Sequence, residues 1–519
     1  MKSLTSALII LSLSASVFTV TAQSQDQIVH QIVKEASEHS QLKEMAYQLF
    51  DSIGPRLVGS PQMEQANHWA VQKFKAWGIS AENQQWGEWR GWKRGITHID
   101  MLSPRVKSLE GMQLAWSPAT PKKGVTAEVI VLPEEIADAV SFQKWLSSAV
   151  KGKIVMVSMS QPTGRPDDNW EEFALPESLE KMKANRDQQN EAWNNKIKAT
   201  GYNTRTLPEA LEKAGAVAII QNYWSKGFGV DKIFSARTKK IPTVDVALED
   251  YGTLYRLAQH GAKPIIHIDA QSEELGKVPT FNTVATIKGT EKPEEYVVLS
   301  AHFDSWDGGT GATDNGTGTL TMMEAARILK KVYPNPKRTI IIGLWGSEEQ
   351  GLNGSRAFVE DHPEIVKNIQ AVFNQDNGTG RVVNISGQGF VNAYKYIGDW
   401  LSAVPNDISK NIETHFPGTP GRGGSDFASF LAAGAPAFSL SSLSWSYWNY
   451  TWHTNRDTYD KVVFDDVQSN AILTAILAYK ASEDPETTSR EQRVLPINTR
   501  TGKQMEWPTP TSPNRSGGE

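Results

Sequence analysis

The stretch YVVLSAHFDSWDGGTGATDNG, residues 296–316, decides the fold predicted for this chain of 519 residues. Its apolar start predicts a buried strand, and the glycine-rich run that follows it leads into a helical pattern over residues 319–331. Further apolar runs and helical patterns alternate downstream, at residues 339–344, 355–358, 369–373, 435–440 and 465–481. This alternation is typical of an α/β fold with a mostly parallel sheet and helices on both faces.

The pattern between residues 125 and 268 is different, because short apolar runs there are separated by Gly and Pro. We predict a β-rich unit inserted into the main domain, with an exposed charged helix over residues 176–199. The expected organisation is a signal peptide (1–22), a first part of the main domain (23–118), the insertion (119–275), the rest of the main domain (276–486) and a flexible tail (487–519).

The N-terminus carries Lys2, an apolar run from Ala7 to Val20, and small residues that end at Ala22. This order predicts a secretory signal peptide cleaved after Ala22, hence a secreted or periplasmic protein with no membrane span in the mature chain. The alternative is an N-terminal membrane anchor. It is disfavoured because the apolar run is shorter than the roughly 20 residues that a span needs.

Composition excludes several classes of function. The net charge of -5, from 53 basic and 58 acidic residues, gives no basic stripe of the kind that binds nucleic acid. The chain has no cysteine, so cysteine-ligated metals and thiol nucleophiles are excluded. Any metal ion must therefore be held by His, Asp and Glu.

Three predicted strands end in candidate ligands, and ligands of parallel sheets gather beyond the carboxyl ends of the strands. These candidates are His302, Asp304 and Asp314 after the first strand, Glu348 and Glu349 after the second, and Asp376 after the third. Imidazole and carboxylate together suit zinc, and two ions roughly 3.5–4 Å apart need a bridging carboxylate. The ligand count therefore predicts a site for two metal ions, with zinc as the expected metal.

Each candidate also has an ordinary explanation when it is taken singly. The adjacent acids Glu348 and Glu349 could begin a solvated helix, although one of them could instead bind metal while the other acts as general base. Asp314 and Asp376 are also typical of turns. Asp304 is placed to accept the second N–H of His302, which favours a ligand role for that histidine. His453 lies far downstream in an aromatic loop.

Five segments, taken in order, resemble the zinc exopeptidases of the aminopeptidase and glutamate carboxypeptidase family. They are HFDS (302–305), GATDNG (311–316), WGSEEQG (345–351), GGSD (423–426) and WHT (452–454). The early stretch IGPRLVGS (53–60) and the insertion are most similar to the plasma glutamate carboxypeptidase branch. The resemblance implies the zinc-exopeptidase fold, a mostly parallel mixed sheet between helices, with an inserted β-rich protease-associated domain.

The resemblance also implies a role for each site residue. Asp314 would bridge two zinc ions, with His302 and Asp376 completing one site, Glu349 and His453 completing the other, and Glu348 acting as general base. Asp304 and Asp426 would contact the ligands without binding metal themselves. The Asp314–Asn315 peptide would be cis. Family members place Tyr or His where this chain has Trp452 and Phe427. The candidates for stabilising the oxyanion are therefore Tyr447 and Tyr450.

The expected function is that of a secreted zinc-dependent exopeptidase that hydrolyses peptides from the N-terminus, or dipeptides. One alternative is a carboxypeptidase, for which Arg422 could bind the substrate carboxylate, although a solvated loop arginine explains it as well. Another is a non-catalytic binding protein on the same fold. A one-zinc cyclase is disfavoured by the full ligand set, and a serine hydrolase by the lack of a G-x-S-x-G turn. The insertion is expected to cover the cleft or to mediate homodimerisation.

Overall fold

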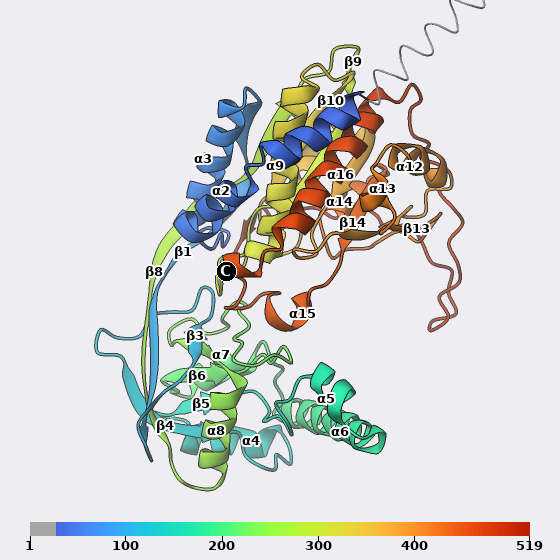
Figure 1. The fold of residues 1–519 in the computed structure, drawn as a ribbon. Helices are drawn as coiled ribbons and strands as arrows, with labels where there is room; N and C mark the ends of the chain where they lie inside the picture. The colour runs from blue at the N-terminus through green and yellow to red at the C-terminus, as the bar shows by residue number, and fades with distance from the viewer. Residues whose placement is uncertain (1–26, 519) are drawn as a thin grey trace, which may run out of the picture.

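The computed structural model describes residues 27–518, so the predicted signal peptide lies outside the described residues. The chain forms two bodies joined by two long antiparallel strands, β1 (Ser80–Ser103) and β8 (Ile265–Ile287) (Figure 1). We call residues 97–270 the distal unit and the rest the main body. Among the described residues, no helix is both long enough and apolar enough to cross a membrane.

The main body is built around β9 (Lys292–His302), which lies between β10 (Arg338–Trp345) and β11 (Ile369–Asn374). These three strands run parallel, and β14 (Ala437–Ser442) continues the parallel sheet beside β11. Every residue of β10 and β11 is buried, as expected for parallel strands covered on both faces. The edges are completed by β8, β12 (Val382–Ser386) and β13 (Glu413–His415).

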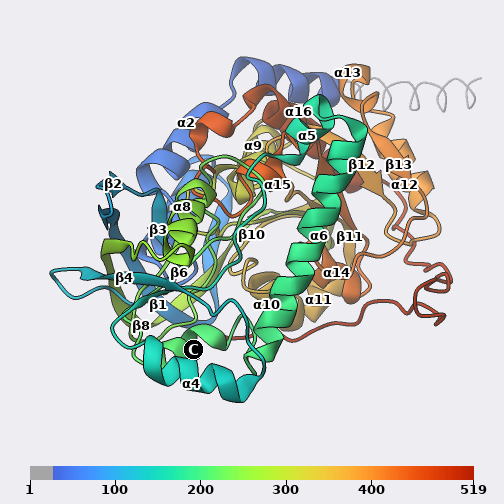
Figure 2. The ribbon, with the colours of Figure 1, turned by 90° about the horizontal axis from the view of Figure 1, so that it is seen from below.

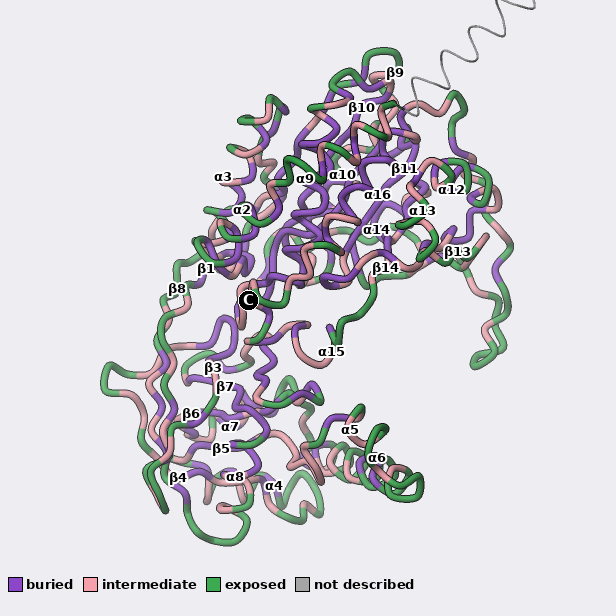
Figure 3. Tube along the Cα trace, viewed as in Figure 1, coloured by how far each residue is buried: buried purple, intermediate pink, exposed green. Residues whose placement is uncertain are grey.

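Helices cover both faces of this sheet. α9 (Thr317–Val332) and α16 (Phe464–Glu483) pack together on one face, and α10 (Asn353–Asp361) and α14 (Phe427–Ala432) lie on the other (Figures 1 and 2). The remaining described helices of the main body are residues 27–38, α2 (Leu42–Ala46), η1 (Tyr47–Ile53), α3 (Pro61–Ala76), η2 (Ala312–Gly316), α11 (Pro363–Lys367), α12 (Ala393–Leu401), α13 (Asn406–Ser409), α15 (Tyr447–Tyr450) and η3 (Tyr459–Lys461). Burial is concentrated in the central strands and the helices beside them (Figure 3). The predicted α/β class is confirmed.

The distal unit has its own small sheet and core. Four strands run parallel and a fifth is antiparallel at the edge: β4 (Val125–Val131), β5 (Ile154–Met156), β6 (Ala218–Gln221), β7 (Thr243–Val246) and β3 (Gly111–Gln113). Its other elements are β2 (Lys107–Ser108), α4 (Ala139–Ala149), α5 (Asp167–Phe173), α6 (Pro176–Ala199), α7 (Leu207–Lys213) and α8 (Leu248–Gln259). The helix α6 coincides with the predicted charged helix. The core of the distal unit includes Ile99 and Met101 of β1, a strand that pairs with β8 along its whole length. The unit therefore begins before residue 119, where we expected the insertion to start.

The C-terminal segment differs from the flexible tail that we expected over residues 487–519. Within the described part, β15 (Ser516–Gly517) pairs in parallel with β1. Arg515 forms an ion pair with Asp361 at 2.7 Å, and the rings of Trp507 and Phe390 lie 5.6 Å apart. A few aromatic and ionic contacts thus hold a segment whose composition offers little apolar surface.

Candidate metal centre

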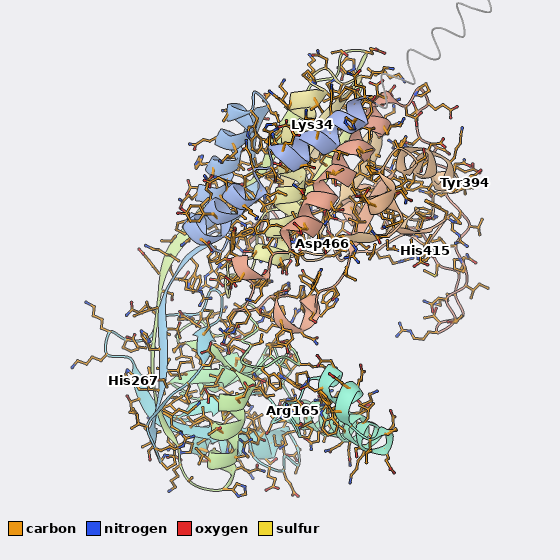
Figure 4. The ribbon with its side chains drawn as sticks, in the orientation of Figure 1. Lys34, Arg165, His267, Tyr394, His415 and Asp466 are labelled. Atoms are coloured by element: carbon orange, nitrogen blue, oxygen red, sulfur yellow. The ribbon has the colours of Figure 1, made fainter. Side chains whose placement is uncertain are left out.

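The carboxyl ends of the central strands meet at one place, as their parallel arrangement requires. β9 ends on His302, and the acids Glu348 and Glu349 follow β10 after two residues. Asp376 follows β11, and Asp314 lies in η2 (Ala312–Gly316), just before α9. The fifth predicted ligand, His453, comes from the loop after α15. The structure therefore brings together all five predicted ligands. His267 and His415, labelled in Figure 4, lie on opposite sides of the molecule and belong to neither group of potential ligands.

Two overlapping groups of potential ligands form this centre. His302, Asp314 and Asp376 make one group, and Asp314, Glu349 and His453 make the other, with ligand atoms within 4.8 Å of one another in each. His302 Nε2 lies 3.5 Å from Asp314 Oδ1 and 3.1 Å from Asp376 Oδ1. His453 Nε2 lies 3.3 Å from Asp314 Oδ2 and 2.8 Å from Glu349 Oε2. Asp314 therefore turns one carboxylate oxygen toward each histidine.

The chemistry of these donors fits divalent metal ions. Asp314 Oδ2 and Glu349 Oε1 are buried without a hydrogen-bond partner. Burial, and then the charges of neighbouring carboxylates, raises the pKa values of Glu348 and Glu349 well above their usual range. Cations between these groups would give the unpartnered oxygens a ligand and would reduce the repulsion between the carboxylates. Two imidazoles with carboxylates are a ligand set that suits zinc.

Asp304 supports the centre in a different way from the one we expected. His302 Nδ1 lies 3.0 Å from the backbone oxygen of Asp304, while the nearer carboxylate oxygen is 3.7 Å away. The carboxylate instead accepts the backbone N–H groups of Glu348 at 3.0 Å and Glu349 at 3.3 Å. Asp304 thus links the end of β9 to the two acids after β10, because its side chain reaches the turn that carries them.

Two further acids lie buried behind the centre. Asp426 is one of the carboxylates whose charge raises the pKa of Glu348, and burial raises its own pKa to about 7. Asp457, which the sequence did not single out, accepts the backbone N–H groups of Thr313 at 2.7 Å and Asp314 at 2.9 Å. It therefore fixes the backbone of the shared ligand. Its only signal in the sequence is its place four residues after His453.

Arg56 is a second residue whose role the sequence did not reveal, although it lies within the quoted stretch 53–60. Its side chain is buried and donates hydrogen bonds to the carbonyl oxygens of Phe303 at 2.7 Å, Thr310 at 2.9 Å and Gly311 at 2.8 Å. Burial lowers its pKa to about 10. Arg56 thereby holds the glycine-rich loop that connects two of the ligands.

The two tyrosine candidates occupy different positions. Tyr447 is buried and lies near the Asp314 carboxylate. Burial would raise the pKa of Asp314, but the contacts with both histidines, and with Tyr447, lower it overall. Tyr450 is half-buried and lines, together with Tyr447, a neighbouring cavity of about 520 Å³. Tyr447 is therefore the better placed of the two.

Three further predictions concern the Asp314–Asn315 peptide, Arg422 and Trp452. The Asp314–Asn315 peptide is cis, as the resemblance implied. Arg422 is exposed and donates to the backbone oxygen of Glu506, which fits the explanation of a loop arginine held by the C-terminal segment. Trp452 takes the place beside His453, and the two rings stack with centroids 3.9 Å apart.

Known proteins share this architecture. Residues 282–478 match the model of peptidase family M28. Mouse (Mus musculus) Carboxypeptidase Q is 28% identical over 450 residues, which cover 85% of this chain and 86% of that relative. Human (Homo sapiens) Carboxypeptidase Q is likewise 28% identical over 450 residues, covering 85% of each chain.

A solved structure of a peptidase M28 precursor from Shewanella amazonensis SB2B is similar in fold, with a TM-score of 0.66 and 24% identity over 92% of this chain and 100% of that one. A zinc aminopeptidase from Bacillus subtilis gives a TM-score of 0.55 with 19% identity, over 87% of this chain and 96% of that one. These two likenesses concern the fold, whereas the family model and the Carboxypeptidase Q relatives concern the sequence as well. Residues 282–478 therefore form a peptidase domain of family M28, and the chain is a metallopeptidase similar to the zinc exopeptidases of that family.

Proposed function

We propose that this protein is an exported two-zinc exopeptidase that hydrolyses peptides from the N-terminus, or dipeptides. The observation that carries the proposal is the position of Asp314, whose two oxygens face two separate histidine and carboxylate groups. His302 and Asp376 would hold one zinc ion, Glu349 and His453 the other, and Asp314 both. The signal-like N-terminus supports export. We also propose that residues 119–275 form a protease-associated domain, which makes up most of the distal unit.

When bound, the metal pair would supply Lewis acidity toward the scissile carbonyl and toward a water molecule. In our proposal, Glu348 accepts the proton of that water and passes it to the leaving amine. Glu348 belongs to neither ligand group, and its backbone is fixed by Asp304, so its carboxylate is free for this task. The Tyr447 hydroxyl would donate a hydrogen bond to the developing oxyanion.

The charge of the site indicates whether the enzyme binds the N-terminus or the C-terminus of its peptide substrate. The free amine of a substrate N-terminus is attracted by the buried carboxylates, whereas a C-terminal carboxylate needs a basic partner. Arg422 is engaged by the backbone of Glu506, which disfavours it as that partner. The alternative, a carboxypeptidase, is supported by the relatives named Carboxypeptidase Q. The presence of all five ligands and the base disfavours a non-catalytic binding protein.

The direct test measures the zinc content of the protein and determines whether it cleaves peptides from the N-terminus or from the C-terminus. We expect protein stripped by chelator and reloaded with zinc to retain about two zinc ions per chain and to cleave dipeptides and aminoacyl anilides. Cleavage of N-blocked peptides only would favour the carboxypeptidase alternative. Stoichiometric zinc without hydrolysis of any peptide would favour the binding protein, and a protein that takes up no zinc would contradict the proposal altogether.

Tyr447→Phe should lower kcat by roughly a hundredfold while KM changes little, because the lost hydrogen bond acts on charge that develops during the reaction. Steady-state kinetics on a dipeptide would measure this change, with zinc content determined on the same samples. Tyr450→Phe is the matched control, since Tyr450 lines the same cavity but is half-buried, and it should behave like the wild type. Equal kcat values for the two variants would rule out the role given to Tyr447.

A further inference from the structure

The two ligand groups rest on different supports. His302 is the last residue of β9, and Asp376 lies two residues after the end of β11, the neighbouring strand of the central sheet. His453 instead lies in a loop, where its backbone adopts a left-handed conformation with φ of 60°. This conformation is unfavourable for a residue with a side chain, so neighbouring structure must hold it. The neighbours of this loop therefore decide whether His453 stays in place.

Part of that support comes from the distal unit. The N–H of Ile233 donates to the backbone oxygen of His453 at 2.8 Å, and the N–H of Asn455 donates to that of Asp231 at 3.0 Å. Lys232 and Thr454 form the antiparallel bridge between these two bonds. Residues 231–233 and 453–455 are thus paired like two short strands, although they belong to different bodies. Consistent with this, α15 and the loop after it lie between the two bodies (Figure 1).

A reciprocal pair of hydrogen bonds locks this pairing. The backbone N–H of Asp231 donates to Asn455 Oδ1 at 3.0 Å, and Asn455 Nδ2 donates to Asp231 Oδ2 at 3.0 Å. Asp231 is only 1% exposed, so its side of both bonds is shielded from water. Next to them, Arg456 donates to the backbone oxygen of Gly229 at 2.7 Å. The loop is therefore tied to the distal unit on both sides of the bridge.

Side chains of the distal unit also fix the imidazole. The ammonium group of Lys232 lies 4.4 Å from the centre of the Trp452 ring, a cation–π contact. That ring in turn stacks on His453, with centroids 3.9 Å apart. Phe234 meets His453 edge-on at 5.1 Å. A third ring, Trp306 of the main body, lies 5.8 Å from that of His453. Of the three aromatic neighbours of the ring that would bind metal, one thus belongs to the distal unit and a second contacts Lys232 of that unit.

We propose that the distal unit positions His453 and thereby sets the affinity of one of the two metal positions, that of Asp314, Glu349 and His453. The inference rests on the proposed two-zinc function. The other position, with His302 and Asp376, is carried by the central sheet and does not depend on this contact. Asp231 and Asn455 are positioning residues in this account, and the pairing between the two bodies links the placement of the distal unit to the integrity of the centre.

The test is a zinc titration of the chelator-stripped, full-length protein in the presence of a competing chelator. Asn455→Asp places a carboxylate against Asp231 and should weaken one of the two zinc-binding steps by at least about tenfold, leaving the other unchanged. The double variant Asp231→Asn with Asn455→Asp exchanges acceptor and donor, so it restores both bonds. We expect it to regain most of the lost affinity.

Lys232→Met provides a second, independent variant, with Lys232→Arg as its conservative counterpart. The loss of the cation–π contact should weaken the same zinc step, and arginine should preserve it. Lys153→Met is the matched control, because Lys153 lies in the distal unit but pairs with Glu128, and it should bind zinc like the wild type. Thermal unfolding of each stripped variant distinguishes a local change from a folding defect.

The outcomes separate this inference from the function on which it rests. A wild type that binds fewer than two zinc ions overturns both. A wild type that binds two zinc ions and cleaves peptides, with Asn455→Asp and Lys232→Met unchanged or weakened equally at both steps, overturns the inference alone. The inference would also be overturned if the double variant did not regain zinc affinity although its stripped form unfolded like the stripped wild type.

Discussion

Glu348→Gln is expected to reduce kcat/KM for a dipeptide by about a thousandfold while zinc content stays the same. The substitution keeps the size of the side chain but removes its ability to accept a proton. Glu348 is half-buried beside the centre, and the group that Asp304 holds is its backbone N–H, which the substitution does not change. The residue also lies outside both ligand groups. The variant should therefore fold and bind metal normally.

Kinetics and zinc analysis on the same protein samples would check this expectation. Glu349→Gln is the natural comparison, because the neighbouring residue contacts His453 at 2.8 Å and belongs to a ligand group. That variant should lose zinc as well as activity. If Glu348→Gln also lost zinc, Glu348 would be a ligand rather than a base. If it kept most of its activity, another residue would have to accept the proton.

The positions of the candidate ligands other than His453 could be predicted from the sequence because their support is local. An apolar run such as residues 296–300 predicts a buried strand, and a parallel sheet delivers whatever follows its strands to one edge. The charged helix α6 was also predictable, since few of its residues need a partner elsewhere. His453 was different: its loop carries no periodic pattern, and only the resemblance connected it with the other ligands.

The long strands could not be predicted in the same way. β1 mixes charged residues, glycines and tryptophans without a regular alternation, and its partner β8 lies far away in the sequence. Pairing between the two strands stabilises both, with register shifts at several places. Such pairing depends on non-local contacts, which a periodicity argument does not detect.

The supporting residues of the centre escaped prediction for the same reason. Arg56 serves three carbonyl groups about 250 positions away in the chain, and Asp457 serves the backbone of Thr313 and Asp314. Neither residue carries a local pattern that indicates such a partner. The C-terminal segment likewise looked unstructured, because its few anchoring side chains find their partners only in the folded protein.

Asp314→Ala is expected to abolish detectable peptidase activity and to remove zinc from both positions. The residue turns one oxygen toward each histidine, so its loss opens both ligand groups at once. Asp376 and His453 each belong to a single ligand group. The variants Asp376→Ala and His453→Ala should therefore each lose mainly one of the two zinc ions. Zinc titration of the three stripped variants, at equal protein and chelator concentrations, would reveal this difference directly.

A stability measurement ensures that the loss of zinc is not mistaken for unfolding. Without metal, the centre gathers buried carboxylates that repel one another, and burial with these charges raises the pKa of Glu349. Removing the carboxylate of Asp314 relieves part of this repulsion. It also removes the contacts with both histidines that lower the pKa of Asp314, and this loss opposes the gain. The stripped variant should therefore unfold close to the temperature of the stripped wild type, whereas zinc should stabilise the wild type much more than the variant. A variant that still bound one zinc ion tightly would mean that the two ligand groups do not share Asp314.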